Sequence, residues 1–101
     1  MRLLHFIGNY VYMEASDRHA GEQVMLISRS MNHQRPICFS FWYHMYGLRL
    51  GRLSIKVVTR NLTKVLWEKN GNQGHKWKEA KINITGIPLD YQVMHLLYNP
   101  F

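Results

Sequence analysis

Bulky and polar side chains alternate most clearly in residues 38–47. One face of this stretch carries Phe39, Phe41, Tyr43 and Met45, and the other carries Ser40, Trp42, His44 and Tyr46. A period of two is typical of a β-strand, because successive side chains point to opposite faces. Since both faces are bulky, the pattern predicts a central strand whose second face is also covered, by a loop, a neighbouring strand or a partner.

Six further stretches show strand-like patterns between polar or glycine-containing turns; they are residues 9–15, 23–28, 53–57, 65–69, 77–84 and 91–97. In the stretch 77–84, the alternation places Ala80, Ile82 and Ile84 inward and Asn83 outward. No segment of useful length has the helical period. Short strands at regular spacing predict an all-β protein, an antiparallel two-sheet β-sandwich.

Turn signals separate these strands. Residues 16–21 form a polar turn that ends in glycine, and Asn70 and Gly71 open the strongest turn signal in the chain. Asn-Gly pairs supply the positive backbone angle that tight turns require. We therefore expect a hairpin at this point, with Trp67 and Trp77 packed against each other as a cross-strand pair.

The composition is that of one folded domain. The chain has 101 residues, of which 47% are hydrophobic, which is ample for a core. No run of about 18 apolar residues exists that could span a membrane. The apolar part of residues 2–7 is too short for a signal peptide, so none is evident. We expect a domain over residues 8–97, with short tails at 1–7 and 98–101.

The chain is basic, with 13 Lys and Arg against 6 acidic residues and a formal charge of +7. Such an excess attracts polyanions, but here the basic residues are scattered singly. The densest group is Lys76, Lys78 and Lys81. An ordinary solvated face is favoured, and Trp77 between two lysines is better explained by packing than by stacking on nucleic-acid bases. No nucleic acid is expected, whereas an anionic polysaccharide stays open as a partner.

No motif for catalysis, cofactor binding or metal binding stands out. The six histidines lack the short spacing of a ligand pair. Cys38 and His44 would share one strand face, but six residues of extended chain separate them by roughly 20 Å, too far for one shared ion. The six carboxylates are dispersed, and Cys38 has no base placed beside it by the sequence. We therefore expect no enzyme activity, no metal and no cofactor.

Two glycosylation sequons occur, at Asn61 and Asn83. Asn61 falls in a predicted turn and Asn83 on the outward side of its strand, so that a glycan at either would avoid the core. Cys38 is the single cysteine and cannot form an internal disulfide. This fits a quietly buried thiol or a reducing compartment.

Longer motifs resemble a known family. The run Cys-x-x-Phe-Trp-Tyr-His-Met-Tyr-Gly from Cys38, the pattern Gly-x-Tyr-x-Tyr-x-Glu from Gly8, and the pattern Gly-x-Gln-Gly-x-x-Trp from Gly71 resemble the MAM domain of extracellular adhesion receptors and cell-surface proteases. The similarity runs in the family's order from about Gly8 to Val93. It implies a jelly-roll-like sandwich.

The resemblance also implies a function: a non-catalytic, extracellular or cell-surface interaction module of a membrane-anchored or secreted protein, bound by a protein partner or homophilically. It implies that Cys38 is a half-cystine whose partner is absent here. Because the family's cysteine-containing first segment and its acidic last strand are not matched, we expect an incomplete domain lacking both ends. Two alternatives are a basic polysaccharide-binding module and a truncated fragment without independent function.

Overall fold

The computed structural model describes residues 2–6, 9–12, 23–47 and 51–98. The turn predicted at 16–21 and residues 99–101 of the predicted C-terminal tail lie outside these ranges. Among the described residues, no helix has the length and apolar character that crossing a membrane requires.

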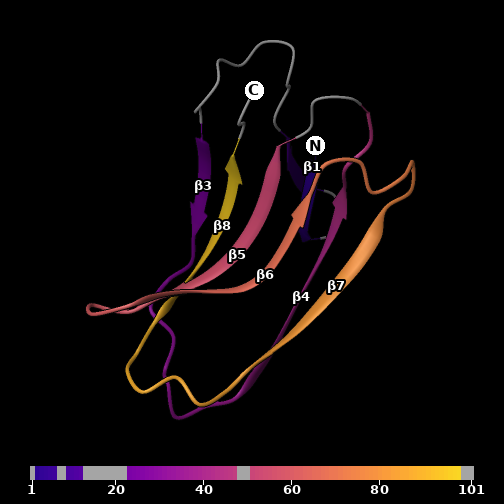
Figure 1. Cartoon of the computed structure of the whole chain (residues 1–101). Coiled ribbons are helices and arrows are strands. Elements are labelled where there is room, and N and C mark those ends of the chain that lie inside the picture. Colours follow the sequence, from indigo (N-terminus) through magenta and orange to yellow (C-terminus); the bar gives the residue numbers. More distant parts are fainter. Residues whose placement is uncertain (1, 7–8, 13–22, 48–50, 99–101) are drawn as a thin grey trace.

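The described chain consists of strands joined by turns and loops (Figure 1). The strands are β1 (Arg2–Phe6), β2 (Asn9–Tyr12), β3 (Gln23–Ile27), β4 (Ile37–His44), β5 (Arg52–Val58), β6 (Thr63–Asn70), β7 (Lys78–Ile84) and β8 (Gln92–Tyr98). The seven stretches predicted to be strands correspond to β2 through β8. The additional strand, β1, lies in the segment expected to be a tail.

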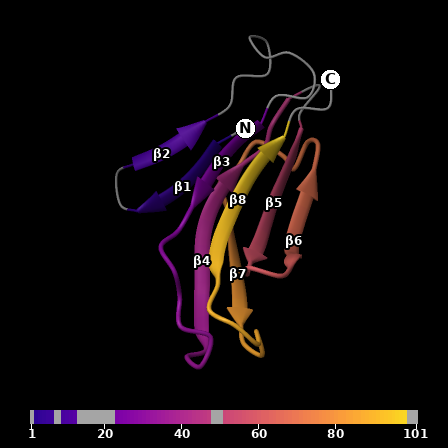
Figure 2. The same ribbon diagram turned by 90° about the vertical axis from the view of Figure 1, so that its left-hand side faces the viewer.

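The strands form two four-stranded sheets, with orders β2-β1-β4-β7 and β3-β8-β5-β6. Every neighbouring pair is antiparallel, which confirms the antiparallel β-sandwich. The chain changes sheet at the connections β2–β3, β3–β4, β4–β5, β6–β7 and β7–β8, as in a jelly roll. Figure 2 shows the two pairs that stay within one sheet, β1 with β2 and β5 with β6, on opposite sides of the molecule.

The core lies between the sheets and follows the predicted alternation. Its buried residues are Phe41, Tyr43, Met45, Leu53, Ile55, Val57, Ala80, Ile82, Ile84, Tyr91, Val93 and Leu97. Strand β4 contributes to the core the face that carries Phe41. Ala80 of β7 lies opposite Phe41 in the register of β4 with β7. The inward placement of Ala80, Ile82 and Ile84 is thereby confirmed.

A β-bulge explains how two consecutive large residues of β6 both reach this core. The register of β5 with β6 shifts between Ile55 and Lys56, which pair with Trp67 and Val65. Leu66 is therefore the extra residue, and a bulge re-aims side chains that would otherwise alternate. Leu66 and Trp67 both pack against the core.

The hairpin predicted around Asn70 and Gly71 is wrong. A turn does occur, with Gly71 at a φ of +68°, but β6 and β7 belong to different sheets. The chain crosses from one layer to the other here. Trp67 packs between the sheets against Phe41 and Tyr43, with ring centroids 5.1 and 5.0 Å away, instead of pairing with Trp77 across a hairpin.

Candidate interaction surface

The outer side of β4 carries large side chains that the core does not use. Along this strand exposure alternates, so that Cys38, Ser40 and Trp42 face outward while Phe41 and Tyr43 face the core. Trp42 is 43% exposed, and Tyr46, just beyond the strand, is 52% exposed. β4 lies between β1 and β7, which confirms the central strand. The predicted covering of its second face is wrong at Trp42 and Tyr46, because the described chain leaves both rings exposed.

The segment 71–77 brings further rings to this end of β4. The backbone N–H of Gln73 donates to the Met45 carbonyl at 2.7 Å, and that of Gly71 donates to the Gly51 carbonyl at 3.1 Å. The Asn72 side-chain oxygen accepts from the Gly74 N–H at 3.0 Å. The first bond attaches the segment between β6 and β7 to the end of β4, the second attaches it to the residue before β5, and the third is internal to the segment.

As a result, the rings of His44, Tyr46, His75 and Trp77 form one contiguous cluster, and Trp42 is exposed on the same outward side of β4. The His75 ring lies 4.3 Å from Tyr46 and 5.2 Å from His44, measured between centroids. The Trp77 ring lies 5.5 Å from His44 and is itself 38% exposed. We refer to Trp42, His44, Tyr46, His75 and Trp77 as the outer aromatic surface. Strand alternation already groups Trp42, His44 and Tyr46 on one face. His75 and Trp77 lie too far from them in sequence for a local pattern to connect the two groups.

The two sequon asparagines are both exposed. Asn61 lies in the turn between β5 and β6, where its N–H donates to the Thr59 hydroxyl at 3.2 Å. Asn83 lies on the outward side of β7, directly opposite Cys38 in the register of β4 with β7. Cys38 is a free, exposed cysteine, so the description of a quietly buried thiol is wrong.

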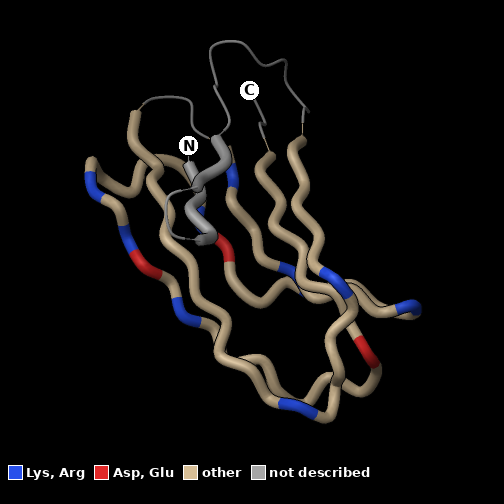
Figure 3. Tube along the Cα trace, turned by 180° about the vertical axis from the view of Figure 1, so that it is seen from behind, with Lys and Arg blue, Asp and Glu red and all other residues tan. Residues whose placement is uncertain are grey.

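Positive charge is spread over the molecule. Figure 3 shows lysines and arginines distributed along the chain, with acidic residues between some of them. Lys78 shares the strand phase of the buried Ala80, whereas Lys81 has the opposite phase and lies 3.7 Å from the Glu79 carboxylate. Lys78 and Lys81 therefore lie on opposite faces of β7, and Lys76 precedes the strand.

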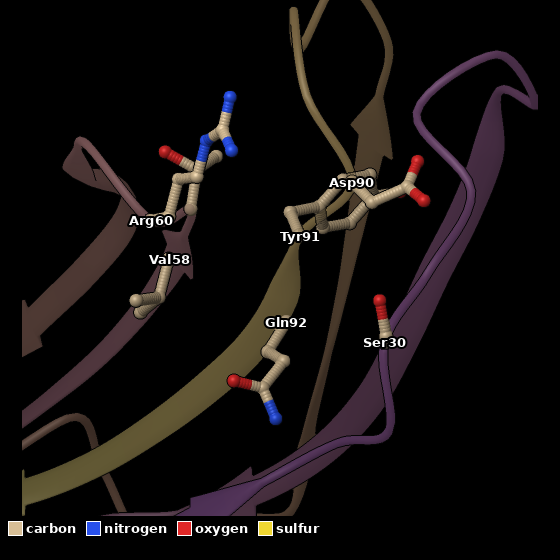
Figure 4. A pocket seen from close by; sticks show the side chains of 7 residues that line it. Ser30, Val58, Arg60, Asp90, Tyr91 and Gln92 are labelled. Carbon is tan, nitrogen blue, oxygen red and sulfur yellow. The ribbon is translucent and has the colours of Figure 1, made fainter.

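A pocket of about 310 Å³ lies at another place on the sandwich (Figure 4). It is lined by Ser30, Val58, Thr59, Arg60, Asp90, Tyr91 and Gln92. The His33 ring Nδ1 lies 2.7 Å from Asp90 Oδ1, and the His33 N–H donates to the same oxygen at 3.0 Å. The side-chain hydrogen bond, followed by the backbone one, lowers the pKa of Asp90 below its ordinary value of 3.8. Asp90 is thus already engaged by His33.

Burial has the opposite effect on two tyrosines, raising the pKa of Tyr43 and of Tyr91 above the ordinary 10.0. Both hydroxyls therefore stay neutral at physiological pH. The Tyr91 hydroxyl is buried and lacks a hydrogen-bond partner within the described ranges.

Histidines and carboxylates do not converge into a larger site in the part of the chain that the structure describes. No group of three or more His, Cys, Asp or Glu side chains there is placed to hold a metal ion. The structure does bring His44 and His75 together, with His44 Nε2 3.2 Å from His75 Nδ1. Sequence spacing missed this pair, because it depends on how the β6–β7 segment folds back on β4.

Comparison with known proteins finds a sequence profile and several relatives that are similar to this chain. The sequence profile described as MAM domain, meprin/A5/mu, matches residues 5–96. Neuropilin-1 of Xenopus laevis is 40% identical over 91 residues, which cover 86% of this chain and 10% of that protein. MAM domain-containing glycosylphosphatidylinositol anchor protein 2 of Homo sapiens is 38% identical over 93 residues, covering 79% of this chain and 10% of that protein. The chain thus spans about a tenth of the length of these relatives.

Proposed function

The chain belongs to the MAM domain family, and from this premise we propose that it is a non-catalytic protein-interaction module working outside the cell or at its surface. The module corresponds to the predicted residues 8–97 together with strand β1, which lies between β2 and β4 in the first sheet. It would act as part of a longer protein that is secreted or held at the membrane. The glycosylphosphatidylinositol anchor in the name of one group of relatives supports attachment to the membrane for those proteins.

The observation that carries this proposal is the outer aromatic surface. Exposed Trp and Tyr side chains are enriched where proteins contact one another, because they bury a large area at a low cost in side-chain entropy. Trp42 and Tyr46 project from one outer face of the sandwich and Trp77 lies beside them. A protein partner, or a second copy of the module, would bury these rings.

The contact is tested with beads coated with the secreted chain. The proposal predicts that the beads aggregate through contact between copies, and that aggregation is lost in the double variant Trp42→Ser/Tyr46→Ser. A matched control, Met25→Ser/Ile27→Ser, removes two side chains of 53% and 56% exposure from strand β3 of the other sheet. Equal aggregation of both variants and the wild type would overturn the assignment of this face.

Sulfated polysaccharide binding is the alternative function, and it rests on the charge of +7. The scattering of the lysines gives it less support than the outer aromatic surface gives to protein contact. Salt separates the two, because screening weakens contacts between exposed charges. Binding to heparin that disappears at raised salt and on charge reversal of Lys76, Lys78 and Lys81 would favour the alternative.

The same proposal makes Asn61 and Asn83 glycan acceptors and Cys38 a half-cystine that pairs with a cysteine outside this sequence. Their exposure supports both roles. Secretion of the chain, followed by sizing with and without removal of N-linked glycans and reductant, tests them. Glycan-bearing monomer or disulfide-linked dimer is expected. Retained, unglycosylated aggregate would instead indicate a fragment without independent function.

A further inference from the structure

The outer aromatic surface contains a histidine pair with a separation suited to a metal ion. His44 is the last residue of β4, and His75 lies in the segment before β7. His44 Nε2 and His75 Nδ1 are 3.2 Å apart. Two nitrogens bound to one tetrahedral ion, each at about 2.0–2.1 Å from it, are about 3.3 Å apart. The separation of the two nitrogens therefore already matches that of a metal-bound pair. Each ring would turn so that its lone pair points at the ion and not at the other nitrogen.

We propose that His44 and His75 form a two-ligand site for a divalent late transition-metal ion such as Zn²⁺ or Cu²⁺. Imidazole is a preferred ligand of these ions, and Cu²⁺ is expected to bind most tightly of the divalent series. Carboxylate-seeking ions such as Ca²⁺ and Mg²⁺ are not expected here, because they need several oxygen ligands. Water completes the coordination shell.

Packing around the pair holds both rings before the ion arrives. The Tyr46 ring packs against His75 at a tilt of 42° with 4.3 Å between centroids, and Trp77 contacts His44 at 5.5 Å between centroids. The hydrogen bond from the Gln73 N–H to the Met45 carbonyl fixes the segment that carries His75. Ligands that are already oriented lose less entropy when they bind.

The proton balance is simple. Without metal, one of the two facing nitrogens carries a hydrogen and donates it to the other. When the ion binds, that hydrogen moves to the other nitrogen of the same ring or to solvent, and both facing nitrogens donate lone pairs to the ion. No oxidation or reduction is involved.

Neighbouring charge limits the affinity. Lys76 and Lys78 follow His75 closely in sequence, and both are exposed. Their positive charge opposes a cation, although solvent and salt screen it over about 8 Å at physiological ionic strength. Removing this charge in the double variant Lys76→Gln/Lys78→Gln is therefore expected to tighten metal binding.

The test is calorimetric titration of the folded chain with Zn²⁺. Wild type should bind one ion at this pair, and His44→Gln or His75→Gln should each weaken that binding roughly tenfold or more, since the second ligand's contribution is intramolecular. The double variant should be hardly weaker than either single variant, because both lose the same shared ion. The control His33→Gln removes a half-buried histidine that pairs with Asp90 elsewhere on the molecule, and it should bind Zn²⁺ like the wild type.

Two results would overturn the proposal: single variants that bind Zn²⁺ as tightly as the wild type, or single-variant losses that simply add in the double variant, which indicates separate one-histidine sites. Because His75 is exposed in a loop, His75→Gln keeps the test valid even if His44→Gln alters the strand. Histidine ring NMR signals provide a second measurement. Both His44 and His75 should shift with Zn²⁺, and the control variant should leave those shifts unchanged.

Discussion

The two faces of β4 carry similar side chains in different surroundings. On the inner face, Phe41 and Tyr43 are buried and pack edge-on against Trp67 from the opposite sheet. On the outer face, Trp42 lies between them in sequence and is left substantially exposed. Only the alternation of the strand separates these aromatic residues into two groups.

Aromatic content alone therefore does not distinguish residues that stabilise the fold from residues that are available to bind a partner. The inner rings lose their contact with water on folding and so stabilise the sandwich. The outer rings gain little of this stabilisation in the isolated chain and would gain it on contact with a partner. Substitutions on the two faces should therefore separate stability from binding.

Truncation of an inner ring should have the largest effect. Phe41→Ala removes a fully buried side chain that contacts Phe39, Tyr43, Trp67 and His95. It is expected to lower the free energy of unfolding by about 3–5 kcal/mol, through lost transfer free energy and the cavity left behind. Urea denaturation measures this. A loss below about 1 kcal/mol would show that the inner face does not carry the core.

A substitution in the segment between β6 and β7, which carries His75, should have the next largest effect on stability. Gly74 has a φ of +95°, and no neighbouring atom would meet an added Cβ. Gly74→Ala is therefore expected to cost about 1–2 kcal/mol through backbone strain alone. Thermal unfolding gives the cost, and weaker Zn²⁺ binding would accompany displacement of His75. Unchanged stability would mean that this backbone angle is not required.

An outer ring should matter much less to stability. Trp42→Ser is expected to change the free energy of unfolding by less than about 1 kcal/mol, as for most surface substitutions. The comparison with Phe41→Ala, one position away on the same strand, uses the same denaturation experiment. If Trp42→Ser destabilises the chain as much as Phe41→Ala does, the outer face belongs to the fold and not to an interaction surface.

The smallest effect on stability is expected for substitution of Asp90, an exposed residue outside β4. Since its hydrogen bonds with His33 lower the pKa of Asp90 below 3.8, the carboxylate contributes stability at pH values above 3.8, and that contribution is lost as the pH falls through the lowered pKa. Asp90→Asn should therefore be less stable than the wild type at neutral pH, and this difference in the free energy of unfolding should shrink in acid. A difference independent of pH would contradict the role of this carboxylate.

Local patterns predicted much of the fold. The alternation in residues 77–84 correctly placed Ala80, Ile82 and Ile84 in the core, because a strand with one buried face must alternate. The alternation in residues 38–47 likewise predicted which side chains of β4 share a face. The motifs quoted from Gly8 to Val93 also identified the family.

Non-local relations could not be predicted in this way. The Asn70–Gly71 turn signals a change of direction but does not say whether the chain stays in its sheet, and it crosses to the other. The bulge at Leu66 is set by pairing with β5. His44 and His75 are 31 positions apart, so their contact depends on the packing of the β6–β7 segment.

Photo-crosslinking tests most directly whether the outer face of β4 is the contact surface. A benzophenone amino acid replaces Trp42 in one secreted sample and Ile27, on β3 of the other sheet, in a second. Illumination is predicted to give a covalently linked pair of chains from position 42 and little or none from position 27. Crosslinking from position 27 alone, or equally from both positions, would contradict the assignment of protein contact to the outer aromatic surface.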